Sequence, residues 1–155
     1  MREIIGDLFS QECDAICITT SGIVNRHGQL IMGAGCALEA KNRWPKLPFT
    51  FGELLALNGN IPVIIKKEFL FESSDSIRPY DIISFPTKNH WLDKSGLDLI
   101  VKSCAGLMNI VAFHGIKKVV LPRPGCGCGG LDWQKVKNLI SPILDDRIYI
   151  ISNGK

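Results

Sequence analysis

Short apolar runs alternate with segments of helical periodicity along this chain, and that alternation limits the possible folds more than any other feature. A parallel neighbour can be reached only by a crossover, so strands separated by long helical segments are expected to pair in parallel. The pattern predicts an α/β domain with a mostly parallel central sheet and helices on both faces. The first predicted strand begins at Arg2 and ends near Gly6 and Asp7, and the others are residues 14–20, 63–66, 68–71, 81–85, 117–121 and 147–151. The predicted helices are residues 36–43, 51–57, 93–114 and 132–144.

The composition fits one domain, and we expect residues 1–155 to form it. With 155 residues and 46% hydrophobic content, the chain can bury a core without disulfides, so its six cysteines are expected to be reduced. The start of the sequence lacks the apolar segment of a signal peptide, and no apolar run approaches about 18 residues. We therefore expect a cytoplasmic protein with no membrane span, and a monomer.

The charge is only weakly basic. The net charge is +3, and no basic run is longer than two residues. This is too little to predict a nucleic-acid-binding surface, although a small anionic ligand needs only a local site. Cys126 and Cys128 lack both the C-x-x-C spacing and a second ligand pair, so neither a metal nor a cofactor is expected.

Two glycine-rich junctions connect predicted strands to predicted helices. Residues 125–130 contain four glycines and precede the helix from Asp132, and Gly33 and Gly35 precede the helix over 36–43. Glycine lets the backbone approach a ligand closely, and a helix N-terminus offers unpaired N–H groups to phosphate oxygens. Two such loops favour a ligand with two linked phosphates. Neither the G-x-G-x-x-G fingerprint in a first βαβ unit nor a P-loop is present, so those two nucleotide sites are disfavoured.

Polar residues also stand where predicted strands end. Asp7, Ser21 and Lys88 lie at or just past the carboxyl ends of three strands. In α/β folds the ligand binds at this edge of the sheet, so these side chains are expected to share one rim with the glycine loops.

Three segments, in the same order along the chain, resemble the macrodomain family of ADP-ribose-binding modules. They are residues 6–9 (Gly-Asp-Leu-Phe), 32–37 (Met-Gly-Ala-Gly-Cys-Ala) and 121–127 (Leu-Pro-Arg-Pro-Gly-Cys-Gly). Within the family, residues 85–91 and 125–133 look most like the DarG-type branch, which removes ADP-ribose from modified DNA and is related to the terminal ADP-ribose glycohydrolases. The similarity extends over nearly the whole chain.

The resemblance implies a three-layer α/β/α fold with a mixed, mostly parallel sheet. It also implies that Asp7 holds the adenine amino group, that the two glycine loops hold the diphosphate and distal ribose, and that Lys88 is the catalytic lysine. The expected partner is ADP-ribose or an ADP-ribosylated macromolecule, DNA or protein. The expected ADP-ribose-binding residues are Asp7, Leu8, Thr20, Ser21, Met32, Gly33, Ala34, Gly35, Pro124, Gly125, Cys126, Gly127, Cys128, Gly129 and Gly130.

The sequence departs from the family pattern at three places. Residues 19–22 (Thr-Thr-Ser-Gly) replace an asparagine that many macrodomains carry after the second strand. The loop over 23–31 is longer than in the DarG type, and Gly129 stands where the human glycohydrolase has an acidic residue. The last difference argues against a lysine adduct resolved by that acid.

Several roles stay open at this stage. Lys88 is either a nucleophile or a cation that stabilises charge as the ribosyl bond breaks. Trp91 is expected to pack in the core, and Asp132 to cap a helix. The leading function is an ADP-ribosyl glycohydrolase; the alternatives are a non-catalytic ADP-ribose reader and a phosphatase acting on ADP-ribose 1″-phosphate.

Overall fold

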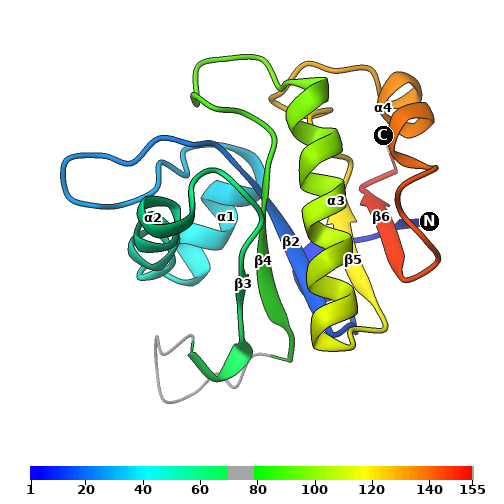
Figure 1. The fold of residues 1–155 in the computed structure, drawn as a ribbon, viewed down its shortest axis with the longest axis horizontal. Helices are drawn as coiled ribbons and strands as arrows, with labels where there is room; N and C mark the ends of the chain where they lie inside the picture. Colours follow the sequence, from blue (N-terminus) through cyan, green and yellow to red (C-terminus); the bar gives the residue numbers. More distant parts are fainter. Residues whose placement is uncertain (70–78, 155) are drawn as a thin grey trace.

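One mixed sheet forms the centre of the computed structural model, which describes residues 1–69 and 79–154 (Figure 1). In these residues the strands are β1 (Arg2–Ile5), β2 (Ala15–Thr20), β3 (Ile64–Ile65), β4 (Asp81–Pro86), β5 (Val119–Pro122) and β6 (Ile148–Ser152). The helices are α1 (Gly35–Arg43), α2 (Leu47–Asn58), α3 (Leu97–His114) and α4 (Trp133–Ile140), with the 3-10 turns η1 (Leu8–Ser10) and η2 (Lys67–Phe69). The strand order is β1-β6-β5-β2-β4-β3. Among the strand pairs of residues 1–69 and 79–154, only the β3–β4 pair is antiparallel.

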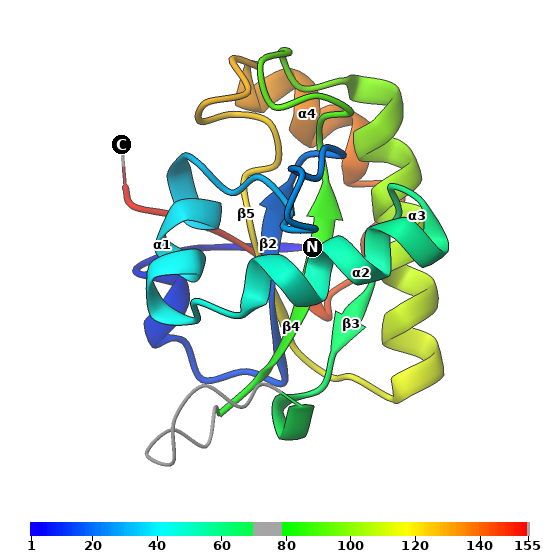
Figure 2. The same cartoon turned by 90° about the vertical axis from the view of Figure 1, so that its left-hand side faces the viewer.

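Helices cover both faces of this sheet, which confirms the three-layer α/β/α prediction (Figures 1 and 2). Because side chains alternate along a strand, β2 serves both layers. Its Ile16 and Ile18 pack in one apolar cluster with residues of α1 and α2. Its Ala15 and Cys17 pack in a second cluster with residues of α3 and α4. A strand buried on both faces has to be apolar throughout, which is why β2 was recognisable in the sequence.

Helix boundaries differ from the predicted ones where a cap or a proline decides them. The helix predicted over 51–57 begins at Leu47, and Pro48 lies in its first turn, where a missing N–H costs nothing. The helix predicted from residue 93 begins at Leu97, after an extended Gly96, and ends at a left-handed Gly115 as expected. The helix predicted over 132–144 ends at Ile140, because Pro142 cannot continue the hydrogen-bond ladder. The structure confirms the cap at Asp132, whose carboxylate accepts a 3.2 Å bond from the Lys135 N–H.

The strand predicted over residues 68–71 is wrong where it can be compared. Residues 67–69 form η2, and residues 70 and 71 lie outside the described part of the chain. Lys66 and the Lys67 N–H both bind the carboxylate of Asp81 at 2.9 and 2.8 Å, so the chain turns around that side chain after β3.

Helix α3 is long and apolar enough to cross a membrane by length and composition, alone among the helices of residues 1–69 and 79–154. No such segment was expected from the sequence. In the structure its Ile100, Cys104, Leu107 and Val111 are buried in the cluster beneath the sheet. These buried residues pack α3 against one face of the sheet.

Candidate functional site

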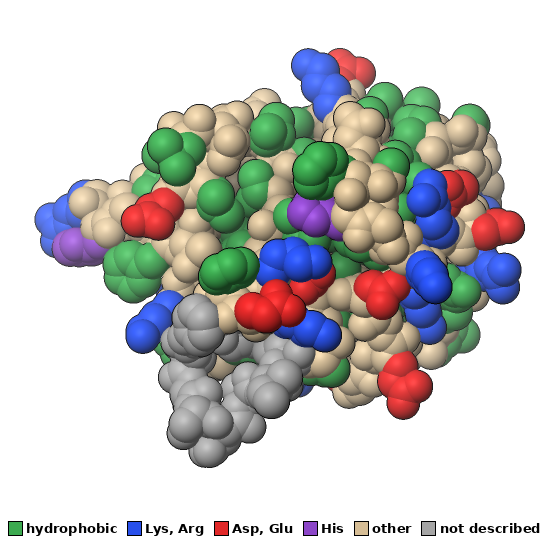
Figure 3. Space-filling view, turned by 60° about the horizontal axis from the view of Figure 1, so that its bottom comes forward, with side chains coloured by type: hydrophobic (Ala, Val, Ile, Leu, Met, Phe, Trp, Pro, Cys, Tyr) green, Lys and Arg blue, Asp and Glu red, His purple; other side chains and the backbone are tan. Residues whose placement is uncertain are grey.

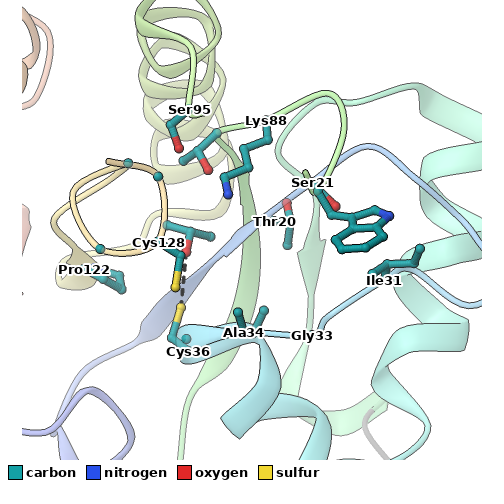
Figure 4. A pocket seen from close by; sticks show the side chains of 18 of the residues that line it. Thr20, Ser21, Ile31, Gly33, Ala34, Cys36, Lys88, Ser95, Pro122 and Cys128 are labelled. Carbon is teal, nitrogen blue, oxygen red and sulfur yellow. Dashed lines mark hydrogen bonds between the residues drawn. The ribbon is translucent and has the colours of Figure 1, made fainter. Parts of the chain in front are cut away.

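A cleft of about 210 Å³ opens at the carboxyl ends of β2, β4 and β5 (Figure 4). The N-terminus of α1 and the glycine-rich β5–α4 loop form two of its walls, and the loop after β4 contributes to a third. The predicted site residues that line it are Thr20, Ser21, Gly33, Ala34, Gly35, Lys88, Gly125, Gly127, Cys128 and Gly129. The parallel order of the strands brings them together from positions up to 109 residues apart in sequence, from Thr20 to Gly129.

Asp7 and Leu8 lie in an adjoining hollow. That hollow shares Cys36 and Pro122 with the cleft, so the two are continuous there. The Ser10 hydroxyl donates a 2.6 Å hydrogen bond to one carboxylate oxygen of Asp7. The second oxygen accepts no side-chain hydrogen bond from the part of the chain that the structure describes, and Asp7 is an exposed residue.

Four predicted binding residues do not line either space. Met32 is only 2% exposed and belongs to the core cluster under α1 and α2. Pro124 is buried, and Cys126 packs against the cluster of α3 and α4. Gly130 takes a positive φ of 75° at the end of the loop. Some residues of a tight loop point away from its concave side, and a sequence motif does not show which residues these are.

The β5–α4 loop folds back on itself and on the loop after β4. The Leu131 N–H donates to the Gly125 carbonyl at 2.9 Å, and the Ser95 N–H donates to the Gly129 carbonyl at 3.2 Å. A Cβ on Gly129 would overlap Ser95 Oγ and lie 2.5 Å from the Gly125 carbonyl oxygen. The acidic side chain that a relative carries at this position therefore has no room here.

Lys88 stands on a well-anchored segment. The Thr87 N–H donates to Thr20 at 3.0 Å, and the side-chain amide of Asn60 donates to the Lys88 carbonyl at 3.0 Å. Figure 4 shows the ammonium of Lys88 pointing into the cleft. Among the described residues, no ion pair includes this ammonium. Its charge is thus available to a ligand.

Three buried polar atoms without a hydrogen-bond partner all belong to residues of this cleft. They are Ser21 Oγ, Ser95 Oγ and Arg123 Nε, and they are the full set of such side-chain atoms in the part of the chain that the structure describes. A buried polar group that finds no partner costs about 1–3 kcal/mol. Ser21 Oγ and Ser95 Oγ belong to serines of the cleft wall, whereas the Arg123 guanidinium lies over the Trp133 ring and near Glu3.

Sequence reasoning missed several lining residues. These are Thr19, Ile31, Cys36, Ala37, Thr87, Trp91, Ser95, Pro122 and Arg123. The expectation that Trp91 packs in the core is wrong, because the residue is 46% exposed. A usable signal was present: Trp91 and Ser95 follow Lys88 in the same loop after a buried strand, where α/β folds place ligands.

Cys36, at the start of α1 beside the cleft, is not an activated thiol. Burial raises the pKa of Cys36, so the thiol stays protonated at neutral pH, and its sulfur lies 3.3 Å from Thr19 Oγ1 (Figure 4). Burial likewise raises the pKa of Cys126. Nucleophilic catalysis by either residue is therefore disfavoured.

The end of the sheet opposite the cleft has mixed charge. Figure 3 shows acidic and basic side chains intermixed there, without a large area of one sign. Ion pairs such as the one between Lys66 and Asp81 contribute to this pattern. The described residues of this face therefore do not form the single-sign surface typical of a nucleic-acid-binding protein.

Comparison with known proteins agrees with this architecture. Residues 53–140 match the Macro domain family. The chain belongs to that family. This macro domain is 36% identical to a DNA ADP-ribosyl glycohydrolase of Mycobacterium tuberculosis over 155 residues, which cover 96% of this chain and 42% of the relative. It is 28% identical to the DNA ADP-ribosyl glycohydrolase of Thermus aquaticus over 145 residues, which cover 94% of this chain and 38% of that protein.

The fold of this macro domain is also that of a solved relative. The macrodomain of Mycobacterium tuberculosis DarG superposes with a TM-score of 0.75 and 27% identity, covering 96% of this chain and 97% of the other. The sequence spans less than half the length of the curated relatives it matches. Their names accordingly describe longer proteins.

Proposed function

We propose that this macro domain binds ADP-ribose and hydrolyses the bond that links a terminal ADP-ribose to a nucleobase or a protein side chain. The observation that carries the proposal is one cleft lined by two glycine-rich loops and by Lys88, whose ammonium points into it and has no ion-pair partner among the described residues. The names of the relatives, both DNA ADP-ribosyl glycohydrolases, support the same reaction.

The two loops suit the diphosphate of ADP-ribose. Helix α1 has nine residues, and its N-terminus carries free N–H groups and the positive end of the helix dipole at the cleft wall. The β5–α4 loop offers further backbone N–H groups from Gly127 and Gly129. The hollow at Asp7 would take the adenine, whose amino group can donate to the carboxylate oxygen that Ser10 leaves free.

The reaction then takes place near Lys88. The bond between C1″ of the distal ribose and the attached group breaks, and its electron pair leaves with that group. Water adds hydroxide to C1″ and supplies a proton to the leaving group, which balances the hydrolysis. The Lys88 ammonium, which points into the cleft, stabilises the negative charge that develops on the leaving group.

A comparison of Lys88→Ala with Lys94→Ala tests this role. Lys94 is an exposed lysine of the same loop that does not line the cleft, so it controls for loss of charge alone. With ADP-ribosylated DNA and ADP-ribosylated protein as substrates, Lys88→Ala should slow ADP-ribose release by about 100-fold or more, as removal of one electrostatic group does elsewhere. The Lys94→Ala variant should release ADP-ribose at the native rate.

The proposal fails if the native chain releases nothing or if Lys88→Ala is as fast as the native chain. Tight ADP-ribose binding without release from any substrate would identify a reader instead. Phosphate release from ADP-ribose 1″-phosphate would identify a phosphatase.

A further inference from the structure

Trp91 is an aromatic residue at the cleft that the proposed hydrolysis does not use. It lines the cleft together with Lys88, three residues earlier in the same loop. It is 46% exposed, and it belongs to neither of the two core clusters.

The ring of Trp91 is held in place before any ligand arrives. It stacks on the ring of His90, with centroids 5.8 Å apart and planes at 21°. The Leu92 N–H donates to His90 Nδ1 at 3.1 Å, which fixes the histidine. Two residues before Trp91, the Asn89 carbonyl accepts a 3.2 Å hydrogen bond from the Gly22 N–H, which connects the loop to the end of β2.

The position of Trp91 relative to Lys88 determines which part of a substrate the indole ring can contact. In the proposed function Lys88 acts at the bond between the distal ribose and the attached group. The diphosphate loops lie on the α1 and β5–α4 walls, whereas Trp91 lies on the loop that carries Lys88. The group attached to the distal ribose would therefore lie beside Lys88, on the side of the cleft that Trp91 lines.

We propose that Trp91 is the stacking surface for the nucleobase that carries the ADP-ribose. A nucleobase has a π-face that can stack on a preorganised indole, whereas a glutamate or aspartate side chain has none. This inference rests on the proposed function.

Binding measurements on Trp91→Ala and Trp91→Phe test it. The ligands are an oligonucleotide with ADP-ribose on one thymine, a peptide with ADP-ribose on one glutamate, and free ADP-ribose. The attached substrates are titrated against variants that also carry Lys88→Ala, to prevent turnover. Phe113→Ala is the matched control, since Phe113 is 85% exposed at the C-terminal end of α3 and does not line the cleft.

Loss of base stacking should weaken oligonucleotide binding by Trp91→Ala roughly 5- to 150-fold. Peptide and free ADP-ribose binding should change less than about twofold, and Trp91→Phe should retain most of the oligonucleotide affinity. Equal weakening of all three ligands, or no weakening of the oligonucleotide, would overturn the inference. If the native protein binds ADP-ribose but hydrolyses no substrate, the proposed hydrolysis is wrong and this binding comparison still decides the role of Trp91. If the native protein binds no ADP-ribose, both proposals are wrong.

Discussion

Adding one methyl group at Gly129 should damage both the stability of the domain and its cleft. The new Cβ would overlap Ser95 Oγ and lie 2.5 Å from the Gly125 carbonyl oxygen, whereas ordinary contact begins at 3.4 Å. The Ser95 hydroxyl can rotate away, but the Gly125 carbonyl belongs to the backbone of the same loop. The two backbone segments must therefore separate by about 0.9 Å, the difference between these two distances.

The size of the effect follows from that displacement. Overpacking of this kind costs roughly 1–3 kcal/mol, which lowers the melting temperature of a 150-residue domain by about 2–12 °C. A shift near 1 Å in a residue that positions substrate can reduce the reaction rate about 100-fold. Adding Ser95→Ala to Gly129→Ala should restore only part of the stability, because the contact with the Gly125 carbonyl remains.

Gly127→Ala provides the matched control in the same loop. A Cβ on Gly127 would meet no atom within 4 Å, and its backbone is not in the left-handed region, so its melting temperature should equal that of the native protein. Thermal unfolding by circular dichroism and a titration with ADP-ribose measure the two effects. Equal melting temperatures for Gly129→Ala and Gly127→Ala would refute the close packing of the two loops.

Two further predictions concern the thiols and a surface carboxylate. At pH 8, burial keeps Cys13 and Cys104 protonated, because it raises their pKa values to about 11 and about 12, so a disulfide reagent should modify the exposed Cys128 first. ADP-ribose should slow that modification, and the fast phase should disappear in Cys128→Ser; a fast phase that persists there contradicts the assignment. The hydrogen bond from Lys137 lowers the pKa of the Glu3 carboxyl. The ionised carboxylate therefore stabilises the folded state at pH values above the ordinary glutamate pKa of about 4.3. This contribution is lost as the pH falls through the lower pKa of the folded state. The pair is partly exposed, so Glu3→Gln should cost less than about 1 kcal/mol at pH 7 and flatten the acid limb of a urea stability profile; an unchanged limb would show that the pair contributes nothing.

Much of the fold could be predicted because burial on both faces leaves a clear pattern. The apolar strand β2 and the helix α3 with its glycine stop were both identified within a few residues. The strand predicted over 68–71 could not be, because a short apolar run is ambiguous until its neighbours are known. There the carboxylate of Asp81 holds a 3-10 turn at η2.

Some residues of the candidate site could likewise be predicted from the sequence, and others could not. The glycine loops and Lys88 were recognisable because backbone approach and strand ends leave signatures in residue type and position. Ser95 and Arg123 carried no such signature, since a serine or arginine in a loop is usually solvated. Their unpartnered atoms could not be predicted, because they are buried only by the packing of the loops after β4 and β5 against each other.

The sequence by itself determined the order of strands and helices, the chemistry at the strand ends and the family resemblance, because each depends on residues close together in the chain. Only the tertiary structure decided which side chains of each loop face the cleft. Met32 turned out to be core and Trp91 cleft, the reverse of what was expected. The physical reason is that the direction of a loop side chain is set by contacts with segments distant in sequence, such as the bond between Ser95 and Gly129.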